Sequence, residues 1–425
     1  MMIDSNRLNA FNEERLPQHK RNWNFLADTL IKKGIDVNRL LQEIGDFQIA
    51  IPSWALGTGG TRFGRFPQGG EPSNLEEKIM DVGILHTLNK SSGAISLHIP
   101  WDIPEDYNAI KTLAKGLDIK FDAVNSNTFQ DQPNSVHSYK FGSLCHIDQG
   151  VRREAIQHNK EVIDHGVQLG SKALTVWLAD GSSFAGQHSF RGAFQRTLRS
   201  LEEIYDHLPM DWKLLIEYKP YEPNFYSMVI PDWGTSHLLA SKLGDRATTL
   251  VDLGHHLPNT NIEQIVALLM HINKLGGFHF NDSKYGDDDL TVGGNKPYQL
   301  FLIFCELVQG IRETTNPELS WMIDASHNLK DPMEDLLQSV ESIKIAYSRA
   351  LLVDYNSLKE AQKQNDVTTC QSLLQEAFRT DVRPLVKEAM YRKGGVLDVL
   401  DAYRTFDIRN QLIASRGVDS KSTGL

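Results

Sequence analysis

Short apolar runs recur along the middle of the chain, and longer amphipathic stretches separate most of them. Eight apolar runs predict buried strands: 47–56, 94–100, 121–127, 172–180, 212–220, 248–256, 276–282 and 319–327. Stretches such as 152–169, 190–207 and 262–274 predict helices between them. A strand followed by a helix, repeated eight times, predicts an α/β fold, a (β/α)8 barrel over residues 46–330.

An open, doubly wound sheet is the alternative architecture for this alternation. That fold normally carries a glycine-rich phosphate-binding turn that opens a helix after its first strand. Here the glycines after the first predicted strand lie in 57–60, and the following Thr61, Arg62 and Phe63 do not open a helix. The pattern therefore favours the barrel.

Helical patterns flank the predicted barrel on both sides. Residues 1–45 place apolar side chains at helical spacing and predict an N-terminal helical segment. Residues 331–415 predict a helical extension, which either covers its own barrel or contacts a neighbouring subunit. The final residues, 416–425, are expected to be a disordered tail.

The composition excludes several classes of protein. The chain of 425 residues has 40% hydrophobic and 23% charged residues and a net charge of −10, so it has no basic surface for nucleic acid. No apolar run is long enough for a membrane span, and the N-terminus lacks an apolar signal region. The three cysteines form no CxxC pair, which favours a reducing compartment. We therefore expect a soluble cytoplasmic protein.

Four consecutive strands in the second half of the predicted barrel end in side chains that bind metal ions. These are Glu217, Asp252, His279 and Asp324. One such acid is more often part of a salt bridge, and one such histidine is more often hydrogen-bonded in a loop. The C-terminal ends of parallel strands meet at one mouth of a barrel, however, so four in succession predict a divalent metal site there.

Three further candidate ligands lie close by in the sequence. His255 follows Asp252 by three positions, and Asp287 and Asp289 lie two apart in the loop after the strand of His279. An acidic loop alone would usually be solvated, but beside this strand it favours metal binding. Five carboxylates and two histidines are too many for one small cation, so we expect two divalent cations per chain. Mixed oxygen and imidazole ligands suit Mn²⁺, with Co²⁺ or Mg²⁺ as alternatives.

A lysine and an aromatic wall complete the predicted mouth. Lys219 lies two positions after Glu217, so a continued strand would direct both side chains to one face. The first, second and fourth predicted strands carry or end at aromatic or imidazole side chains: Trp54, His98, Trp101 and Trp177. Each tryptophan alone is more often part of a core. Together, beside a polar metal site, they suit a sugar, whose C–H faces stack on rings while its hydroxyls form hydrogen bonds.

These motifs resemble those of a known family. Glu217-x-Lys219, Asp252-x-x-His255 and Asp287-x-Asp289 resemble the two-metal site of aldose–ketose isomerases of the xylose isomerase superfamily. His279 departs from xylose isomerase itself, which places a carboxylate there. The stretches SLHIPWD, VDLGHHLPNTNIE, GGFHFNDSKYGDDDL and MIDASHN are more similar to L-rhamnose isomerases of the broad-specificity branch, and this resemblance extends from about residue 20 to residue 405.

The resemblance implies a reversible isomerase of L-rhamnose and L-rhamnulose that tolerates other sugars, and a homotetramer. It implies a structural metal held by Glu217, Asp252, His279 and Asp324, and a catalytic metal held by His255, Asp287 and Asp289, with Asp252 a candidate bridge. We also expect Asp324 to take part in catalysis. The remaining expected roles concern the sugar: Lys219 near its carbonyl end, His98 near its ring oxygen, Trp54, Trp101 and Trp177 as walls, and Phe63 reaching into a neighbouring subunit's site.

Isomerisation moves a hydrogen between C1 and C2, and two routes are open. The hydrogen passes directly as hydride while a divalent metal polarises the carbonyl, or a carboxylate base forms a cis-enediol. Because metal ligation would occupy the carboxylates, the hydride shift is favoured.

Three other functions compete with an aldose–ketose isomerase. A metal-dependent phosphodiesterase on the same barrel would need a basic groove, which the net charge of −10 does not favour. A ketose 3-epimerase needs a pair of glutamates as opposed acid and base, and Glu217 is the one glutamate among the candidates. A binding protein without activity would have no use for Lys219 and two metals.

Overall fold

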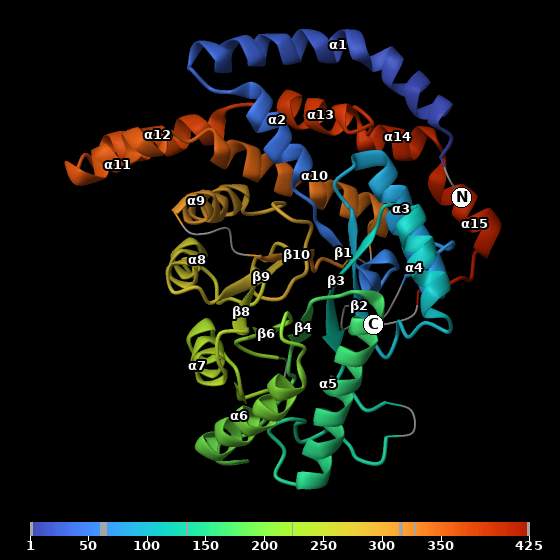
Figure 1. Cartoon of the computed structure of the whole chain (residues 1–425), viewed down its shortest axis with the longest axis vertical. Helices are drawn as coiled ribbons and strands as arrows, with labels where there is room; N and C mark the ends of the chain where they lie inside the picture. Colours follow the sequence, from blue (N-terminus) through green and yellow to red (C-terminus); the bar gives the residue numbers. More distant parts are fainter. Residues whose placement is uncertain are drawn as a thin grey trace.

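The computed structural model describes residues 3–59, 66–132, 135–222, 224–313, 318–326 and 329–422. Within these ranges, eight parallel strands close into a barrel in the order β1-β10-β9-β8-β6-β4-β3-β2 (Figure 1). The strands are β1 (Ala50–Pro52), β2 (Ala94–Ile99), β3 (Lys120–Ser126), β4 (Ala173–Val176), β6 (Lys213–Glu217), β8 (Ala247–Asp252), β9 (Leu275–Phe280) and β10 (Ser320–Ile323). Each overlaps one of the predicted apolar runs, and the predicted barrel is confirmed.

A helix follows each strand and covers the outside of the barrel (Figure 1). These helices are α3 (Leu75–Asn89), α4 (Tyr107–Gly116), α5 (Gln149–Leu169), α6 (Phe190–His207), α7 (Trp233–Leu243), α8 (Ile262–His271), α9 (Pro297–Glu313) and α10 (Pro332–Leu351). Side-chain caps begin several of them: Asn74, Asp106 and Asp148 each accept a hydrogen bond from a backbone N–H of the first turn. The helices expected at 152–169, 190–207 and 262–274 correspond to α5, α6 and α8.

The strands end earlier than the apolar runs predict. β1 is followed by the 3₁₀ helix η1 (Ser53–Leu56), which carries Trp54, and β4 ends just before Trp177. Lys219 likewise lies beyond β6. Its backbone N–H donates to the Ile230 carbonyl at 3.1 Å instead of continuing the barrel ladder. These side chains therefore lie on the connections at the mouth, where backbone partners come from other loops.

A small antiparallel pair, which the sequence pattern does not predict, links two of these connections. β5 (Gly181–Ser182) pairs with β7 (Ser227–Met228), and the Val229 N–H donates to the Asp180 carbonyl at 2.9 Å. Two-residue strands lie below the length at which alternation is readable. The pair ties the connection after β4 to the connection after β6.

The terminal segments form a helical layer on one side of the barrel, outside α10. α1 (Ser5–Lys32) and α2 (Val37–Asp46) pack against α13 (Arg383–Arg392) (Figure 1). α10, the first helix of the predicted extension, packs between α9 and α3 and completes the ring of helices. The rest of the extension comprises α11 (Tyr355–Lys363), α12 (Val367–Arg379), α14 (Val399–Thr405) and α15 (Ile408–Arg416).

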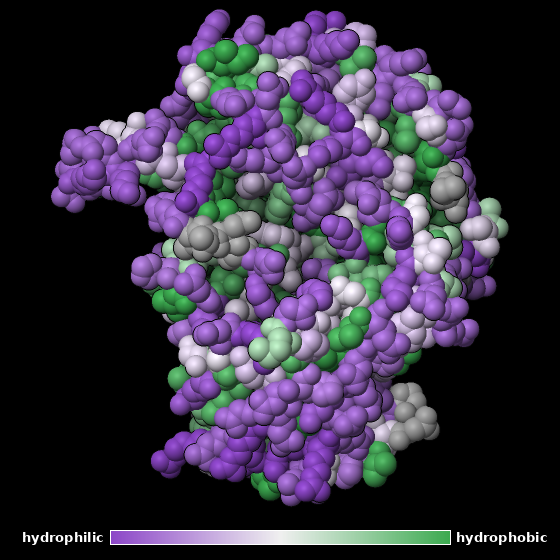
Figure 2. All heavy atoms as spheres, in the orientation of Figure 1, coloured by the Kyte–Doolittle hydropathy of each residue, from purple (hydrophilic) through white to green (hydrophobic). Residues whose placement is uncertain are grey.

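The α11–α12 pair projects from the body, and the face shown in Figure 2 is mostly hydrophilic there. None of the helices in the described ranges is long and apolar enough to cross a membrane. Part of the tail expected to be disordered contacts the connection before α3. Within 417–422, the Ser420 hydroxyl donates to the Glu71 carbonyl at 2.6 Å, and the Ser422 N–H donates to the Glu71 carboxylate at 3.1 Å.

Candidate metal centre

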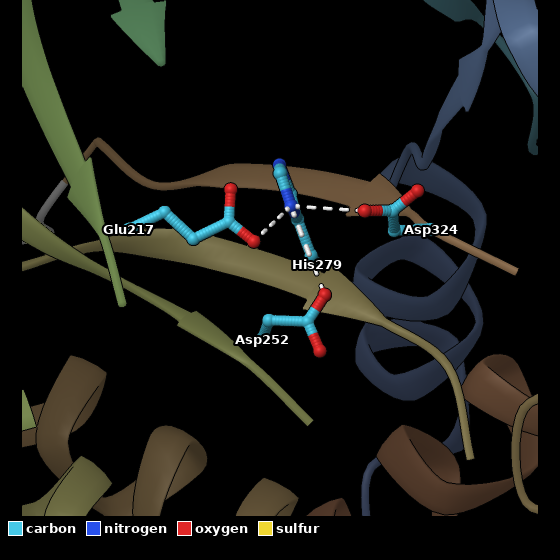
Figure 3. A group of neighbouring side chains, drawn as sticks. All are labelled: Glu217, Asp252, His279 and Asp324. Carbon is cyan, nitrogen blue, oxygen red and sulfur yellow. Dashed lines mark hydrogen bonds and ion pairs between the residues drawn. The ribbon is translucent and has the colours of Figure 1, made fainter. Parts of the chain in front are cut away.

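The barrel brings together the four strand-end residues Glu217, Asp252, His279 and Asp324. One ligand atom from each lies within 4.8 Å of the others (Figure 3). Glu217 and Asp252 are the last residues of β6 and β8, His279 lies on β9, and Asp324 directly follows β10. The expected meeting of these side chains at one mouth is therefore what the structure shows.

His279 lies at the centre of this cluster. Its Nδ1 is 3.2 Å from a Glu217 oxygen, 3.4 Å from an Asp324 oxygen and 3.8 Å from an Asp252 oxygen. Alternation along β9 directs the flanking Phe278 and Phe280 outward, where Phe280 stacks on Phe304 of α9 with ring centroids 5.7 Å apart. Packing of the phenylalanines against the helix layer thus aims the imidazole into the barrel.

Charge in the cluster is unbalanced without a cation. Burial lowers the pKa of His279, but Glu217 and Asp324 more than offset this and raise it to about 10. Burial raises the pKa of Asp252 to about 7, and the charges of Glu217 and Asp324 act in the same direction. Three carboxylates that repel one another around one imidazole are a donor set that a divalent cation would neutralise, so the residues fit a metal.

A second group of candidate ligands adjoins the first. His255 Nδ1 lies 3.1 Å from a Glu217 oxygen, and its Nε2 lies 3.2 Å from an Asp287 oxygen. The Asp287 N–H donates to the Gly254 carbonyl at 2.9 Å, which fixes the acidic loop against the end of β8. Burial raises the pKa of Asp289, and so do the nearby charges of Asp287 and other cluster carboxylates. The structure thus places all seven predicted ligands in one region.

Lys219 lies beside this second group. Its Nζ donates to Asp287 at 2.5 Å and to Glu222, and it lies 5.1 Å from the Trp177 ring centroid. Burial lowers the pKa of Lys219, but the two carboxylates raise it well above its usual range, so the ammonium is charged at neutral pH. Glu222 is a residue that the sequence reasoning missed. It lies three positions after Lys219, and the turn of the connection after β6 brings its carboxylate back to the Lys219 ammonium.

The predicted wall residues also come together. Ring centroids are 5.3 Å apart for Trp54 and His98, and 4.3 Å for His98 and Trp101, which stack. Phe129, which the sequence reasoning missed, lies 5.5 Å from His98 and 5.0 Å from Trp177 and joins them. The signal in the sequence that could have found it is its place two residues after the third apolar run.

The wall contacts the metal cluster through Trp54. The Trp54 indole N–H donates to an Asp324 oxygen at 2.9 Å. Burial lowers the pKa of His98 to about 3, so its imidazole is neutral. Phe63, expected to serve a neighbouring site, lies outside the described residues.

Asn281 is a third residue whose role the sequence reasoning did not identify. Its amide N–H₂ donates to both oxygens of Asp252, at 3.0 and 3.2 Å, and to the Asp324 carbonyl at 3.1 Å. Alternation along the chain from His279 had already placed Asn281 on the same face. Its contacts orient the carboxylate of one candidate ligand and the backbone of another.

Comparison with known proteins agrees with this architecture. Residues 94–301 match the family described as xylose isomerase-like TIM barrel. The chain is 47% identical to a probable sugar isomerase of Rhizobium meliloti, over 98% of this chain and 97% of that protein. It is also 47% identical to a probable sugar isomerase of Mesorhizobium japonicum, over 97% of this chain and 96% of that protein. The central part of the barrel therefore resembles a xylose isomerase-like TIM barrel. Over its whole length, the chain belongs to the family of these probable sugar isomerases.

A solved structure of L-ribulose 3-epimerase shares the fold. The TM-score is 0.51 at 14% sequence identity, covering 75% of this chain and 98% of that chain. The structural similarity shows a common barrel fold. Because the sequence identity is so low, it carries no information on the substrate of this chain.

Proposed function

We propose that the protein is an aldose–ketose isomerase that interconverts L-rhamnose and L-rhamnulose and accepts other aldoses and ketoses. The observation that carries the proposal is the joining of a buried acid–imidazole cluster, a charged lysine and an aromatic wall at one barrel mouth. A polar floor beside flat apolar rings matches the two kinds of surface on a sugar.

Two divalent cations are the proposed cofactors, with Mn²⁺ first and Co²⁺ or Mg²⁺ as alternatives. Glu217, Asp252, His279 and Asp324 would hold the structural ion, and His255, Asp287 and Asp289 would hold the catalytic ion. Bound there, the ions would supply positive charge that stabilises the sugar's O1 and O2 as the carbonyl moves. Asp252 is the expected bridging ligand, and its carboxylate lies 3.8 Å from His279 and 4.0 Å from His255. Glu217 lies between the same two residues, 3.2 Å from His279 and 3.1 Å from His255, and is a second candidate for that role.

The protein's own residues divide the remaining tasks. The charged Lys219 ammonium stands where an oxygen near the sugar's carbonyl end would gain negative charge. Trp54, Trp101 and Trp177 would stack on the sugar and keep water from the reacting carbons, and neutral His98 would contact the ring oxygen. The carboxylates nearest Lys219 are already engaged, Asp287 by His255 and Lys219 and Glu222 by Lys219. A base for the enediol route is therefore disfavoured, and the proposed route is direct hydrogen transfer between C2 and C1.

A ketose 3-epimerase is the nearest rival, and Glu222 bears on it. Such an enzyme needs two opposed glutamates, and Glu222 is a second glutamate at this mouth, in contact with Lys219. It forms an ion pair with Lys219, however, which disfavours its use as a free base.

Substrate specificity is tested by assaying the metal-reconstituted protein on a panel of aldoses and ketoses. We expect interconversion of L-rhamnose and L-rhamnulose with the highest kcat/KM of the panel, and slower conversion of other aldoses. Conversion of ketoses to their C3 epimers, with no aldose formed, would establish the rival instead. Each of Mn²⁺, Co²⁺ and Mg²⁺ is added back separately to rank the metals.

The proposed active unit is a homotetramer in which the loop 57–66 reaches toward another subunit. Phe66 in this segment is 63% exposed in the single chain, and contact with a neighbouring subunit would bury its ring. Sedimentation velocity is expected to give a tetramer, and Phe63→Ala is expected to raise KM or shift sugar preference more than it lowers Tm. Full activity of a monomer at nanomolar protein would contradict this proposal.

A further inference from the structure

A buried carboxylate lies behind the aromatic wall. Asp102, in the turn after β2, is 1% exposed. It accepts hydrogen bonds from the Ser53 hydroxyl, from the His98 backbone N–H at 2.8 Å and from the Lys78 ammonium at 2.6 Å. Its own N–H donates to the His98 carbonyl at 3.0 Å, which closes the turn.

These hydrogen bonds involve the backbone segments that carry three of the wall residues, Trp54, His98 and Trp101. Ser53 immediately precedes Trp54 in η1, and Asp102 immediately follows Trp101. His98 lies between the two indoles, 5.3 Å from one ring and 4.3 Å from the other. One carboxylate therefore sets the relative positions of the backbones that carry three wall rings.

Stability alone does not explain the ion pair of Asp102 with Lys78. Both side chains are 0% exposed. Moving two charges out of water costs free energy that their attraction often does not recover, and a well-packed apolar pair is commonly at least as stable. The Asp102 carboxylate accepts hydrogen bonds from η1, β2 and α3. Because hydrogen bonds are directional, it fixes the relative positions of these three elements, which an apolar pair would not do.

The wall in turn is coupled to the metal cluster. The Trp54 indole donates to Asp324, so a shift of η1 would move the wall relative to the ligands. We propose that Asp102, held by Lys78, is a positioning residue that aligns Trp54, His98 and Trp101 with the metal cluster and thereby sets the affinity for the sugar. The sugar as ligand rests on the proposed function, whereas the alignment of the wall does not.

The test compares two variants with a matched control. Ser53→Ala removes one donor and leaves the buried charges unchanged, and Asp102→Asn removes the charge that holds all three segments. The control is Asp81→Asn. Asp81 lies on the same helix as Lys78 and forms a buried ion pair with Arg416 at 2.7 Å, and neither residue of this pair belongs to the wall. Each protein is assayed for kcat, KM, metal affinity and Tm.

We expect both wall variants to raise KM about tenfold or more, because small displacements of substrate-positioning groups have large effects. Metal affinity should remain unchanged and kcat should change less than KM. Asp81→Asn should lower Tm to a similar extent and leave KM unaltered. Equal KM values in wild type and in folded Ser53→Ala and Asp102→Asn would overturn the proposal.

Near-UV circular dichroism tests the alignment without a substrate. The tryptophan bands should change in Ser53→Ala and Asp102→Asn and remain as in wild type in Asp81→Asn. A wild type that converts no sugar would refute the proposed function, and these spectra would still decide the alignment. Unchanged bands in a folded Ser53→Ala protein would refute the alignment even where the wild type is active, and this variant carries the test if Asp102→Asn does not fold.

Discussion

Lys219→Met is expected to reduce kcat about 10²-fold or more, by analogy with the removal of other donors to a developing oxyanion. The reason is geometric: the Lys219 ammonium lies within 2.5 Å of Asp287 and 5.1 Å from the Trp177 ring centroid, between the candidate catalytic ligands and the wall. Methionine has similar length and no charge. Metal content should remain that of the wild type, as measured by elemental analysis of the purified protein.

Lys330→Met is the matched control for this substitution. Lys330 also pairs with an aspartate, Asp335 at 3.2 Å, but it is half exposed and donates to Thr291, Asp335 and Gln338, none of which is a candidate ligand. Its loss should leave kcat unchanged. A Lys219→Met enzyme with near-normal kcat and a raised KM would mean that the lysine only positions the sugar.

Removing the metal, or substituting its ligands, is expected to have the second large effect on turnover. A chelated protein should lose all turnover, and the two proposed ligand groups should differ in how they respond to substitution. Glu217→Gln and Asp324→Asn should lose both metal and Tm, because buried acids around a missing cation repel one another or must bind protons. Asp287→Asn and His255→Ala should abolish turnover with a smaller loss of Tm, since these residues lie on connections beyond the strands.

Calorimetric metal titration and thermal unfolding of the four variants measure this difference. The protein concentration is kept constant, because an oligomer's Tm depends on it. Equal losses of Tm in both groups would contradict separate structural and catalytic ions. A wild-type stoichiometry of one ion per chain would contradict the pairing itself.

The sequence predicted the barrel and the meeting of the strand-end ligands because both follow from short-range rules. Apolar runs separated by amphipathic stretches identify strands and helices, and parallel strands of a barrel all end at one mouth. Asp252 and His279 therefore face each other across β8 and β9 in register. No long-range information was needed beyond the closing of the ring.

The residues that the sequence did not reveal depend on how the connections fold back. Glu222 meets Lys219 because the chain turns after β6, and Phe129 reaches Trp177 across two connections. The contact between Asp102 and Lys78 joins a turn to a helix 24 positions away. Such contacts are set by tertiary packing, which neither alternation nor helical spacing encodes.

One measurement tests aldose–ketose isomerisation most directly. L-rhamnose deuterated at C2 is incubated with the Mn²⁺-reconstituted protein in ordinary water and followed by deuterium NMR. We predict the appearance of L-rhamnulose with deuterium retained at C1, because the hydrogen passes directly between the two carbons. Absence of any ketose would contradict the isomerase, and a ketose whose deuterium has been lost to water would contradict the direct transfer.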